Sequence, residues 1–345
     1  MVARGRTRTG RSRPTLEEVA AHAGVGRGTV SRVVNNSPRV RESTRQAVER
    51  AIAELGYIPN RAARALAANR TDAVALVIPE TEKRFFAEPY FSDVLHGVGT
   101  GLADTEMQLL LTLVRTENER RRFLQYARAG RVDGVLLVSV HGSDPLPDLL
   151  AEMDLPTVLS GRRSADEPVS YVDSDNVGGA RSAVRHLAET GRRRIATVTG
   201  PLDMYVARCR LGGYQEAVAA AGGDADPSWT AHGDFTEESG RRAMTELLAR
   251  HPDLDAVFAA SDVMAAGALH SLRAAGRRVP EDVAVVGFDD SPIAAHTDPQ
   301  LTSVRQPVEE MGRAMARVLL EGIDDPGAPA QHVVLPTELV RRASS

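Results

Sequence analysis

The chain has 345 residues, of which 42% are hydrophobic and 26% are charged. These values are typical of a globular protein of two or three domains and exclude a disordered or fibrous one. No apolar run approaches about 18 residues, the basic segment 1–13 has no apolar stretch behind it, and Cys209 is the only cysteine. We therefore expect no membrane span, no secretory signal, no disulfide framework and no cysteine-rich zinc site, as in a soluble cytoplasmic protein.

The two ends of the sequence differ strongly in charge. Residues 1–70 contain 14 arginines and five glutamates, a net charge of +9, whereas the remainder contains 28 basic and 41 acidic groups, a net charge of −13. A basic head on an acidic body suits a protein of which only one end approaches a polyanion. The alternative is an arginine-rich tail without a partner. We expect residues 1–13 to form a basic flexible arm.

Residues 15–35 read TLEEVAAHAGVGRGTVSRVVN and have the pattern of two short helices separated at Gly24. Thr15 and Glu18 form the pattern of a capping box before the first helix. The second helix leaves donors, acceptors and small residues on its outer face: Arg27, Gly28, Thr29, Ser31, Arg32 and Asn35. Such a face suits the major groove of DNA, and an amphipathic stretch from Ser43 to Leu55 would complete a three-helix unit. The alternative is a helical hairpin with a solvated polar face.

These residues, followed by TRQAVERAIAELGYIPNRAARALA at 44–67, resemble the head of the LacI/GalR family of bacterial transcription repressors. The resemblance implies a helix-turn-helix domain over 14–58 whose second helix reads an operator half-site. By position, Arg27 and Gly28 would be the base-reading pair. The further expected DNA contacts in this domain are Thr15, Thr29, Ser31, Arg32, Asn35, Arg39, Thr44 and Tyr57. Two departures concern capping, since Gly26 and Arg41 stand where the family usually has serines that cap the second and third helices.

Residues 59–71 are expected to form a hinge helix or linker. Pro59 suits a first helical turn, but about ten residues are too few for a stable isolated helix, so folding upon DNA binding is expected. The resemblance implies that this helix enters the minor groove, with Leu66 as the wedge in the central base step and Asn60, Arg61 and Arg64 as neighbouring contacts. The alternative is a plain linker with Leu66 packed on the body.

From Ala73 onward, short β-branched runs alternate with amphipathic stretches, the pattern of a doubly wound α/β body. About 270 residues suffice for two such lobes with a cleft at the carboxyl ends of their strands. The resemblance implies a body like the periplasmic sugar-binding proteins, with three crossings between lobes near 172, 304 and 325. Lobe 1 would span about 72–171 and 305–325, and lobe 2 about 172–304 and 326–345. We expect 72–345 to bind an effector and to mediate dimerisation.

Six residues match the family's effector-binding positions in the expected cleft: Arg210, Phe235, Ser261, Asp262, Asp289 and Gln306. An arginine fork, a carboxylate and an aromatic face suit a sugar or sugar derivative. The alternatives are that Asp262 and Asp289 cap the helices that follow them, and that Phe235 belongs to the core. Gly161 and Arg162 depart from the family, since many sugar-responsive relatives have a ligand-binding aspartate there. Residues 79–91 are expected to form a long loop that either closes over the ligand or packs on its lobe.

Other patterns do not support an enzyme. GVGRG at 24–28 and GVGTG at 97–101 do not complete a phosphate-binding loop, and DSDNVG at 173–178 lacks the glutamate of a calcium loop. No histidine pattern predicts a metal site, so neither metal nor cofactor is expected. Cys209 lies between two arginines, which allows either a lowered pKa or a plain helical position.

We therefore expect a cytoplasmic, nucleoid-associated repressor that binds a palindromic double-stranded DNA operator as a homodimer under the control of a small molecule. No heptad repeat follows the helix at 307–322, which predicts a dimer, not a tetramer. The competing hypotheses are a sugar-binding transport protein and, less well supported, a cytosolic sugar-active enzyme.

Overall fold

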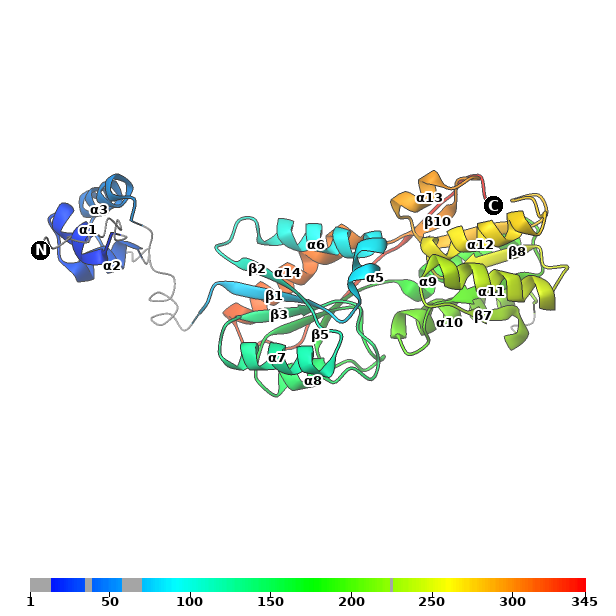
Figure 1. Cartoon of the computed structure of the whole chain (residues 1–345), viewed down its shortest axis with the longest axis horizontal. Coiled ribbons are helices and arrows are strands. Elements are labelled where there is room, and N and C mark those ends of the chain that lie inside the picture. Colours follow the sequence, from blue (N-terminus) through cyan, green and yellow to red (C-terminus); the bar gives the residue numbers. More distant parts are fainter. Residues whose placement is uncertain (1–13, 35–38, 58–69, 224–225) are drawn as a thin grey trace, which may run out of the picture. The chain divides into compact units, whose positions relative to one another are not determined.

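The computed structural model describes residues 14–34, 39–57, 70–223 and 226–345 (Figure 1). The chain divides into two compact units, a head of residues 1–71 and a body of residues 72–345. The predicted basic arm 1–13 and nearly all of the predicted hinge at 59–71 lie outside the described residues. In the part of the chain that the structure describes, no helix is both long and apolar enough to span a membrane.

The head consists of three helices: α1 (Leu16–His22), α2 (Arg27–Val34) and α3 (Glu42–Leu55). Their buried faces form a small core of Val19, Ala20, Val30, Val33, Val48, Ala51 and Tyr57. Gly24 ends the turn after α1 with φ +68°, and Gly56 ends α3 with φ +63°. Both positions require the left-handed backbone that glycine adopts without a steric penalty. The predicted three-helix unit is confirmed.

Lobe 1 of the body is built on sheet A, whose strands are all parallel and run in the order β11-β5-β4-β3-β1-β2. The strands are β1 (Ala73–Ile78), β2 (Gln108–Leu113), β3 (Gly134–Leu137), β4 (Thr157–Ser160), β5 (Ser170–Ser174) and β11 (His332–Leu335). Its helices are α5 (Glu82–Ala87), α6 (Pro89–Leu102), α7 (Glu117–Arg128), α8 (Leu146–Ala151) and α14 (Val308–Asp324). Helices α6 and α14 cover one face of the sheet, and α7 and α8 cover the other (Figure 1). The central strands are therefore buried on both sides, which explains their continuous apolar sequences.

Lobe 2 is built on sheet B, in the order β12-β10-β9-β8-β6-β7, with only the edge strand β12 antiparallel to its neighbour. The strands are β6 (Ile195–Thr199), β7 (Thr230–His232), β8 (Ala256–Ala259), β9 (Ala284–Asp289), β10 (Thr302–Arg305) and β12 (Glu338–Val340). The helices are α9 (Asn176–Glu189), α10 (Tyr205–Ala220), the 3-10 turn η1 (Pro227–Trp229), α11 (Glu237–Arg250), α12 (Asp262–Ala274) and α13 (Pro292–His296). Helices α9 and α10 pack on one face, and α11 and α12 pack on the other. The predicted fold class of a helix-turn-helix head and a two-lobed α/β body is confirmed.

The chain passes between the sheets three times: from β5 to α9, from β10 to α14, and from β11 to β12. The last crossing lies at residues 336–337, so the predicted position near 325 is wrong. The reason is β11, which pairs in parallel with β5 and keeps residues 332–335 in lobe 1. This short edge strand has alternating exposure instead of the apolar run of a central strand, and the sequence pattern gave no sign of it.

The segment 79–91 is helical and not the predicted long loop. Thr81 caps α5 by accepting a hydrogen bond from the backbone N–H of Arg84, and Pro89 takes the first position of α6. Phe91 is fully buried in the core of lobe 1, whereas Phe86 is 81% exposed. The motif GVGTG lies inside α6, where a Cβ on Gly97 would come within 2.2 Å of the carbonyl oxygen of Glu309. Gly97 and Gly101 of this motif therefore allow α14 to pack closely against α6.

Candidate functional site

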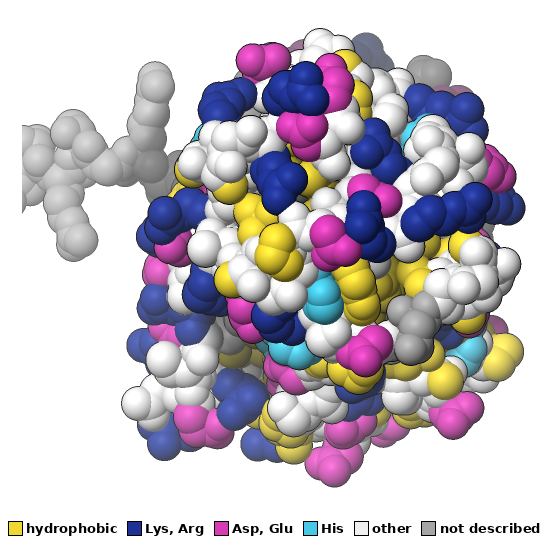
Figure 2. Space-filling model, turned by 90° about the vertical axis from the view of Figure 1, so that its right-hand side faces the viewer, with side chains coloured by type: hydrophobic (Ala, Val, Ile, Leu, Met, Phe, Trp, Pro, Cys, Tyr) yellow, Lys and Arg dark blue, Asp and Glu magenta, His cyan; other side chains and the backbone are white. Residues whose placement is uncertain are grey.

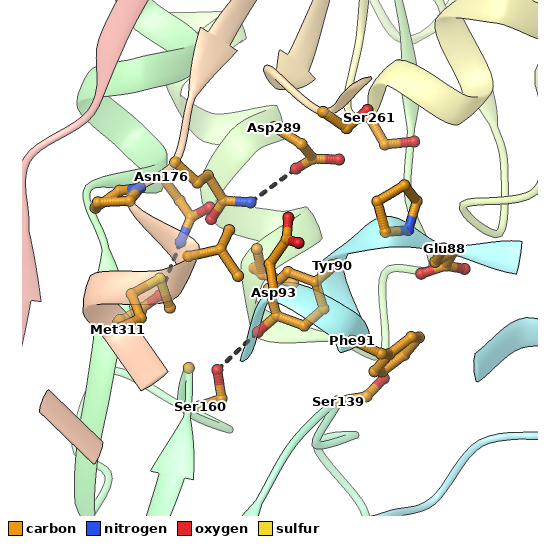
Figure 3. Close-up of a pocket in the computed structure, with 18 of the residues that line it drawn as sticks. Glu88, Tyr90, Phe91, Asp93, Ser139, Ser160, Asn176, Ser261, Asp289 and Met311 are labelled. Atoms are coloured by element: carbon orange, nitrogen blue, oxygen red, sulfur yellow. Dashed lines mark hydrogen bonds between the residues drawn. The ribbon is translucent and has the colours of Figure 1, made fainter. Parts of the chain in front are cut away.

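A cavity of about 400 Å³ lies between the carboxyl ends of the two sheets and is lined by both lobes (Figure 3). Residues after β3, β4 and β5 contribute from lobe 1, and residues after β6, β7, β8, β9 and β10 contribute from lobe 2. This is the position at which open α/β sheets bind ligands. Of the six predicted effector residues, five line the cavity: Arg210, Phe235, Ser261, Asp289 and Gln306.

Arg210 is held rigidly in the wall formed by lobe 2. It lies on α10, is 4% exposed, and its guanidinium carbon lies 3.7 Å from the centre of the Phe288 ring. Its Nε donates to Asn176 Oδ1 at 2.9 Å, and its Nη1 donates to the carbonyl oxygen of Ala260. Nη1 also lies 3.4 Å from Asp289 Oδ1. The guanidinium is thus fixed as a hydrogen-bond fork beside a carboxylate.

Asp289 ends β9 with φ +113°, a backbone conformation that non-glycine residues rarely adopt. Gln306 Nε2 donates to its Oδ1 at 2.7 Å, and Ser174 Oγ donates to Gln306 Oε1 at 2.6 Å. Burial raises the pKa of Asp289 to about 6, although Arg210 and Gln306 both act to lower it. The carboxylate is therefore an acceptor held in place for a ligand, partly removed from water.

Phe235 supplies an aromatic face from lobe 2. It has φ +67°, is 7% exposed, and lies against Gly200, where an added Cβ would come within 2.2 Å of the ring. The Arg84 guanidinium of lobe 1 lies 5.7 Å from the ring centre. The absence of a side chain at Gly200 therefore makes room for the ring. Phe235 is buried and also lines the cavity. The two alternatives for this residue, a core position and an effector-binding position, therefore do not exclude each other.

Ser261 and Asp262 are adjacent in sequence but have different surroundings. Ser261 lines the cavity and caps α12 by accepting from the backbone N–H of Met264. Asp262 is fully buried and accepts from Ser303 Oγ at 2.5 Å and from the backbone N–H of Ser291 at 2.7 Å. The structure does not bring Asp262 to the cavity. Its carboxylate ties the start of α12 to Ser303 in β10 and to Ser291 in the segment after β9.

The lobe 1 wall contains polar residues that were not predicted individually, although the segment 79–91 was expected either to close over the ligand or to pack on its lobe. Tyr90 and Ser160 share a hydrogen bond of 2.7 Å between their hydroxyl oxygens, and Figure 3 shows Ser160 on the opposite side of the view from Asp289. Glu88 also lines the cavity and accepts from Arg84 Nε at 2.6 Å. Burial raises the pKa of Glu88 to about 7, against the opposing effect of Arg84. The segment was interpreted as a loop, so only the exact helix boundary would have revealed these residues.

Asn176 is a further lining residue that was missed. It is 3% exposed, donates from Nδ2 to Asp173 Oδ1 at 2.8 Å, and accepts from Arg210. Asp173 also accepts from Arg162 Nε at 3.1 Å, and the Arg162 guanidinium lies between the rings of Tyr171 and Tyr205, 5.2 Å from each centre. The motif DSDNVG, set aside as a failed calcium loop, therefore contributes to the cavity wall.

The cavity lining contains five arginines and seven acidic side chains. Each lining guanidinium has a carboxylate partner: Arg84 with Glu88, Arg162 with Asp173, Arg210 with Asp289, Arg305 with Asp290, and Arg313 with Glu309. Asp93 and Glu310 add two further carboxylates to the lining. No group of three or more metal-ligating side chains occurs among the described residues. Cys209 is buried next to the cavity wall, and burial raises its pKa, so the alternative of a lowered thiol pKa does not apply.

Opposite charges also alternate over the outer surface of lobe 2. Figure 2, viewed from this end of the body, shows basic and acidic side chains side by side. The exposed ion pairs of lobe 2 include Arg194 with Asp253 at 2.8 Å and Arg278 with Asp282 at 2.8 Å. This face therefore presents no extended basic field of the kind that attracts DNA.

The head presents the predicted recognition helix. Along α2, Arg27, Gly28 and Arg32 are exposed, and Thr29 and Ser31 are half-buried. Arg27 makes an exposed ion pair with Glu17 at 3.1 Å. Gly26 precedes α2 and its carbonyl accepts the first helical hydrogen bonds, but it has no side chain to cap the helix. The outer face of α2 thus combines charge with small side chains.

Other predicted DNA contacts have structural roles in the head. Thr15 and Glu18 form the predicted capping box, with Thr15 N donating to Glu18 Oε2 at 2.7 Å. Tyr57 is 8% exposed in the core of the head. Arg39 is exposed, Thr44 is half-buried in the first turn of α3, and Arg41 precedes α3 without a side-chain cap, as expected. The predicted contacts Asn35, Asn60, Arg61, Arg64 and Leu66 lie outside the described residues.

Comparisons with known proteins agree with this architecture. The family model of bacterial regulatory proteins, lacI family, matches residues 15–60, and that of a periplasmic binding protein-like domain matches residues 184–345. The HTH-type transcriptional regulator CelR of Thermobifida fusca is 54% identical over 336 residues, 97% of this chain and 99% of that protein. The ribose operon repressor of Escherichia coli K12 is 33% identical over 333 residues, 96% of this chain and 99% of that protein.

Solved structures give the same result over nearly the whole chain. A transcriptional regulator CelR–cellobiose complex has a TM-score of 0.78 at 53% identity and covers 96% of this chain and 100% of that one. The lac repressor dimer bound to operator and the anti-inducer ONPF has a TM-score of 0.82 at 27% identity, covering 96% of this chain and 99% of that one. The chain therefore belongs to the lacI family of bacterial regulatory proteins and is a DNA-binding transcriptional regulator.

Proposed function

We propose that this regulator is a cytoplasmic repressor that binds a palindromic operator as a homodimer, and that a neutral glucose disaccharide such as cellobiose controls its affinity for DNA. The observation that carries the effector class is the fixed group of Arg210, Asp289 and Gln306 beside the Phe235 ring. A guanidinium fork, a carboxylate and a flat apolar face match the hydroxyl groups and ring faces of a sugar. The similarity to CelR, one structure of which is a cellobiose complex, supports a disaccharide.

The charges of the cavity favour a neutral effector. Seven carboxylates and five guanidinium groups line it, and each guanidinium is already paired with a carboxylate. A phosphorylated sugar would enter a net acidic site and would have to displace one of these carboxylates. Removing one partner of a buried ion pair is costly, because the other charge is left uncompensated. An uncharged polyol avoids this cost.

The proposed DNA contacts come from the head and the hinge. Arg27 and Gly28 would read bases in the major groove, and the other proposed contacts in the head are Thr15, Thr29, Ser31, Arg32, Asn35, Arg39, Thr44 and Tyr57. Leu66 would wedge into the minor groove, flanked by Asn60, Arg61 and Arg64. For Leu66→Ala we expect weaker binding to the operator with nearly unchanged binding to random DNA. An equal loss of both would contradict the wedge.

The proposed dimer pairs two bodies, so that two heads meet two half-sites. The edge strand β2 supports this arrangement, because Leu110 and Leu111 are 37% and 39% exposed there. Closing the lobes on the effector would move lobe 1 relative to lobe 2 and separate the paired hinges. A coupling of about 1–3 kcal/mol would change operator affinity by about one to two decades.

The test is a selection of bound sequences from a random duplex library at a fixed salt concentration, followed by titration of the selected duplex complex with cellobiose. We expect a palindrome with a central pyrimidine–purine step, and an operator affinity that changes with cellobiose but not with cellobiose phosphate. Sequence-independent, salt-sensitive binding alone would contradict the operator proposal. Selective operator binding that no neutral disaccharide alters would contradict the effector proposal.

A further inference from the structure

Glu88 occupies an unusual position for a carboxylate at the start of a helix. It is the residue before α6, where a side chain normally accepts a hydrogen bond from the first turn, yet its side chain makes no such bond. Instead the side chain lines the cavity, and its Oε1 accepts from Arg84 Nε. Only 13% of the Glu88 side chain is exposed. The Glu88 side chain therefore lies in the cavity wall and does not cap α6.

Arg84 is itself fixed, so the position of Glu88 is well defined. The Nη1 of Arg84 donates to Glu80 Oε1 at 2.7 Å, and Ser139 Oγ donates to the same oxygen at 2.6 Å. Glu80 is 7% exposed, and the Arg84 guanidinium lies 5.7 Å from the Phe235 ring centre on the opposite lobe. The lobe 1 wall thus holds an arginine–carboxylate pair next to an aromatic ring.

The lobe 2 wall also has an arginine–carboxylate pair next to an aromatic ring. Arg210 pairs with Asp289 and lies over the Phe288 ring. Figure 3 shows Glu88 and Asp289 as separate carboxylates on different elements around one cavity. A single hexose ring fills only part of a cavity of about 400 Å³. The pair of Arg84 and Glu88 is therefore available to a second sugar ring.

We propose that Glu88, held by Arg84, is a specificity-determining residue of lobe 1 that accepts hydroxyl hydrogen bonds from the second ring of a disaccharide effector. The inference rests on the proposed sugar effector. Asp289 and Arg210 would bind the first ring in both glucose and a disaccharide. Glu88 would bind only the second ring, and so the site would discriminate a disaccharide from glucose. A carboxylate has two acceptor oxygens and can accept hydrogen bonds from two hydroxyl groups at once. An amide in the same place has only one acceptor oxygen, and its hydrogen bonds are weaker.

The test measures cellobiose and glucose affinity by calorimetry for the full chain, for Glu88→Gln, and for the control Glu82→Gln. Glu82 lies on α5 and pairs with Arg115, and it does not line the cavity. We expect Glu88→Gln to lose about 10- to 100-fold in cellobiose affinity, as for the loss of a charged hydrogen bond, with little change for glucose. Glu82→Gln should behave as the unmodified chain does.

Glu88→Asp keeps the carboxyl group and shortens the side chain. It should also lose affinity for cellobiose but not for glucose, which separates the effect from misfolding. Unchanged cellobiose affinity in Glu88→Gln would overturn the assignment of Glu88 while leaving the proposed function intact. An equal loss for both sugars would also overturn it, since Glu88 would then act on the first ring or on the fold. Failure of the unmodified chain to bind either sugar would overturn the proposed function and this inference together.

Discussion

His141 of lobe 1 and Asp203 of lobe 2 are joined by a hydrogen bond of 2.6 Å between imidazole Nδ1 and carboxylate Oδ2. The backbone N–H of Gly142 also donates to the carbonyl oxygen of Asp203 at 2.9 Å. On the other side of the ring, His141 Nε2 lies 3.7 Å from Glu80 Oε1. The imidazole of His141 therefore lies between a carboxylate of its own lobe and one of the opposite lobe.

This pair predicts a pH-dependent effector affinity. The nearby carboxylate of Glu80 raises the pKa of His141 to about 9, with a further contribution from Asp203. A raised pKa means that the contact is fully present below the ordinary histidine pKa of about 6.5 and is lost as the pH rises through about 9. Because 57% of the Asp203 side chain is exposed, we expect the contact to contribute no more than about 1 kcal/mol.

Asp203→Asn should therefore weaken cellobiose binding by a few-fold at neutral pH and reduce the decline in affinity toward about pH 9. Calorimetric titrations at several pH values would measure both effects. Asp253→Asn is the matched control, because Asp253 makes an exposed ion pair with Arg194 inside lobe 2. Identical pH profiles for Asp203→Asn and the unmodified chain would show that the contact does not contribute to closure.

Arg210→Ala should abolish the response to the effector and leave operator binding intact. The substitution removes the fork that fixes Asn176 and leaves Asp289 without its guanidinium partner. The measurement is operator affinity with and without a saturating concentration of cellobiose. Arg210→Lys keeps the positive charge but not the bidentate geometry, so it should also lose most of the response. A normal response in either variant would contradict the role of Arg210 in effector binding.

The sequence was sufficient to predict the fold because its strands are buried on both faces and therefore apolar throughout, as in AVALVI of β1. It failed at β11, an edge strand without that pattern, and at α5, a helix of only six residues. The cavity shows the same limit. Ser261 and Asp262 are adjacent in the sequence, and only the rotation of the helix decides which of the two side chains lines the cavity. Glu88 and Tyr90 were missed because their place in the cavity depends on the short break between α5 and α6.

Asp262→Ala should reduce stability and not effector affinity. The buried carboxylate accepts from Ser303 Oγ and Ser291 N, and its removal leaves both donors without a partner. Unsatisfied buried donors cost about 1–3 kcal/mol each, so we expect a loss of about 2–6 kcal/mol in the free energy of unfolding. Urea denaturation would measure this loss. Unchanged stability combined with a large loss of cellobiose affinity would mean that Asp262 acts in the site after all.

Arg27→Ala should reduce the preference for the selected operator more than the binding to random DNA. The Arg27 side chain is 74% exposed, and its partner Glu17 is also exposed, so this ion pair is weak and gives way easily to a DNA contact. The loss of one bidentate base contact costs about 1–3 kcal/mol, whereas the loss of a phosphate contact weakens binding to all sequences nearly equally.

Arg50→Ala is the matched control, because Arg50 is exposed on α3 and bonds only to the backbone oxygen of Gln46 among the interactions described. Competition between operator and random duplex at one salt concentration separates these effects. An equal reduction of specific and random binding by Arg27→Ala would assign Arg27 to the phosphate backbone, and not to the reading of bases.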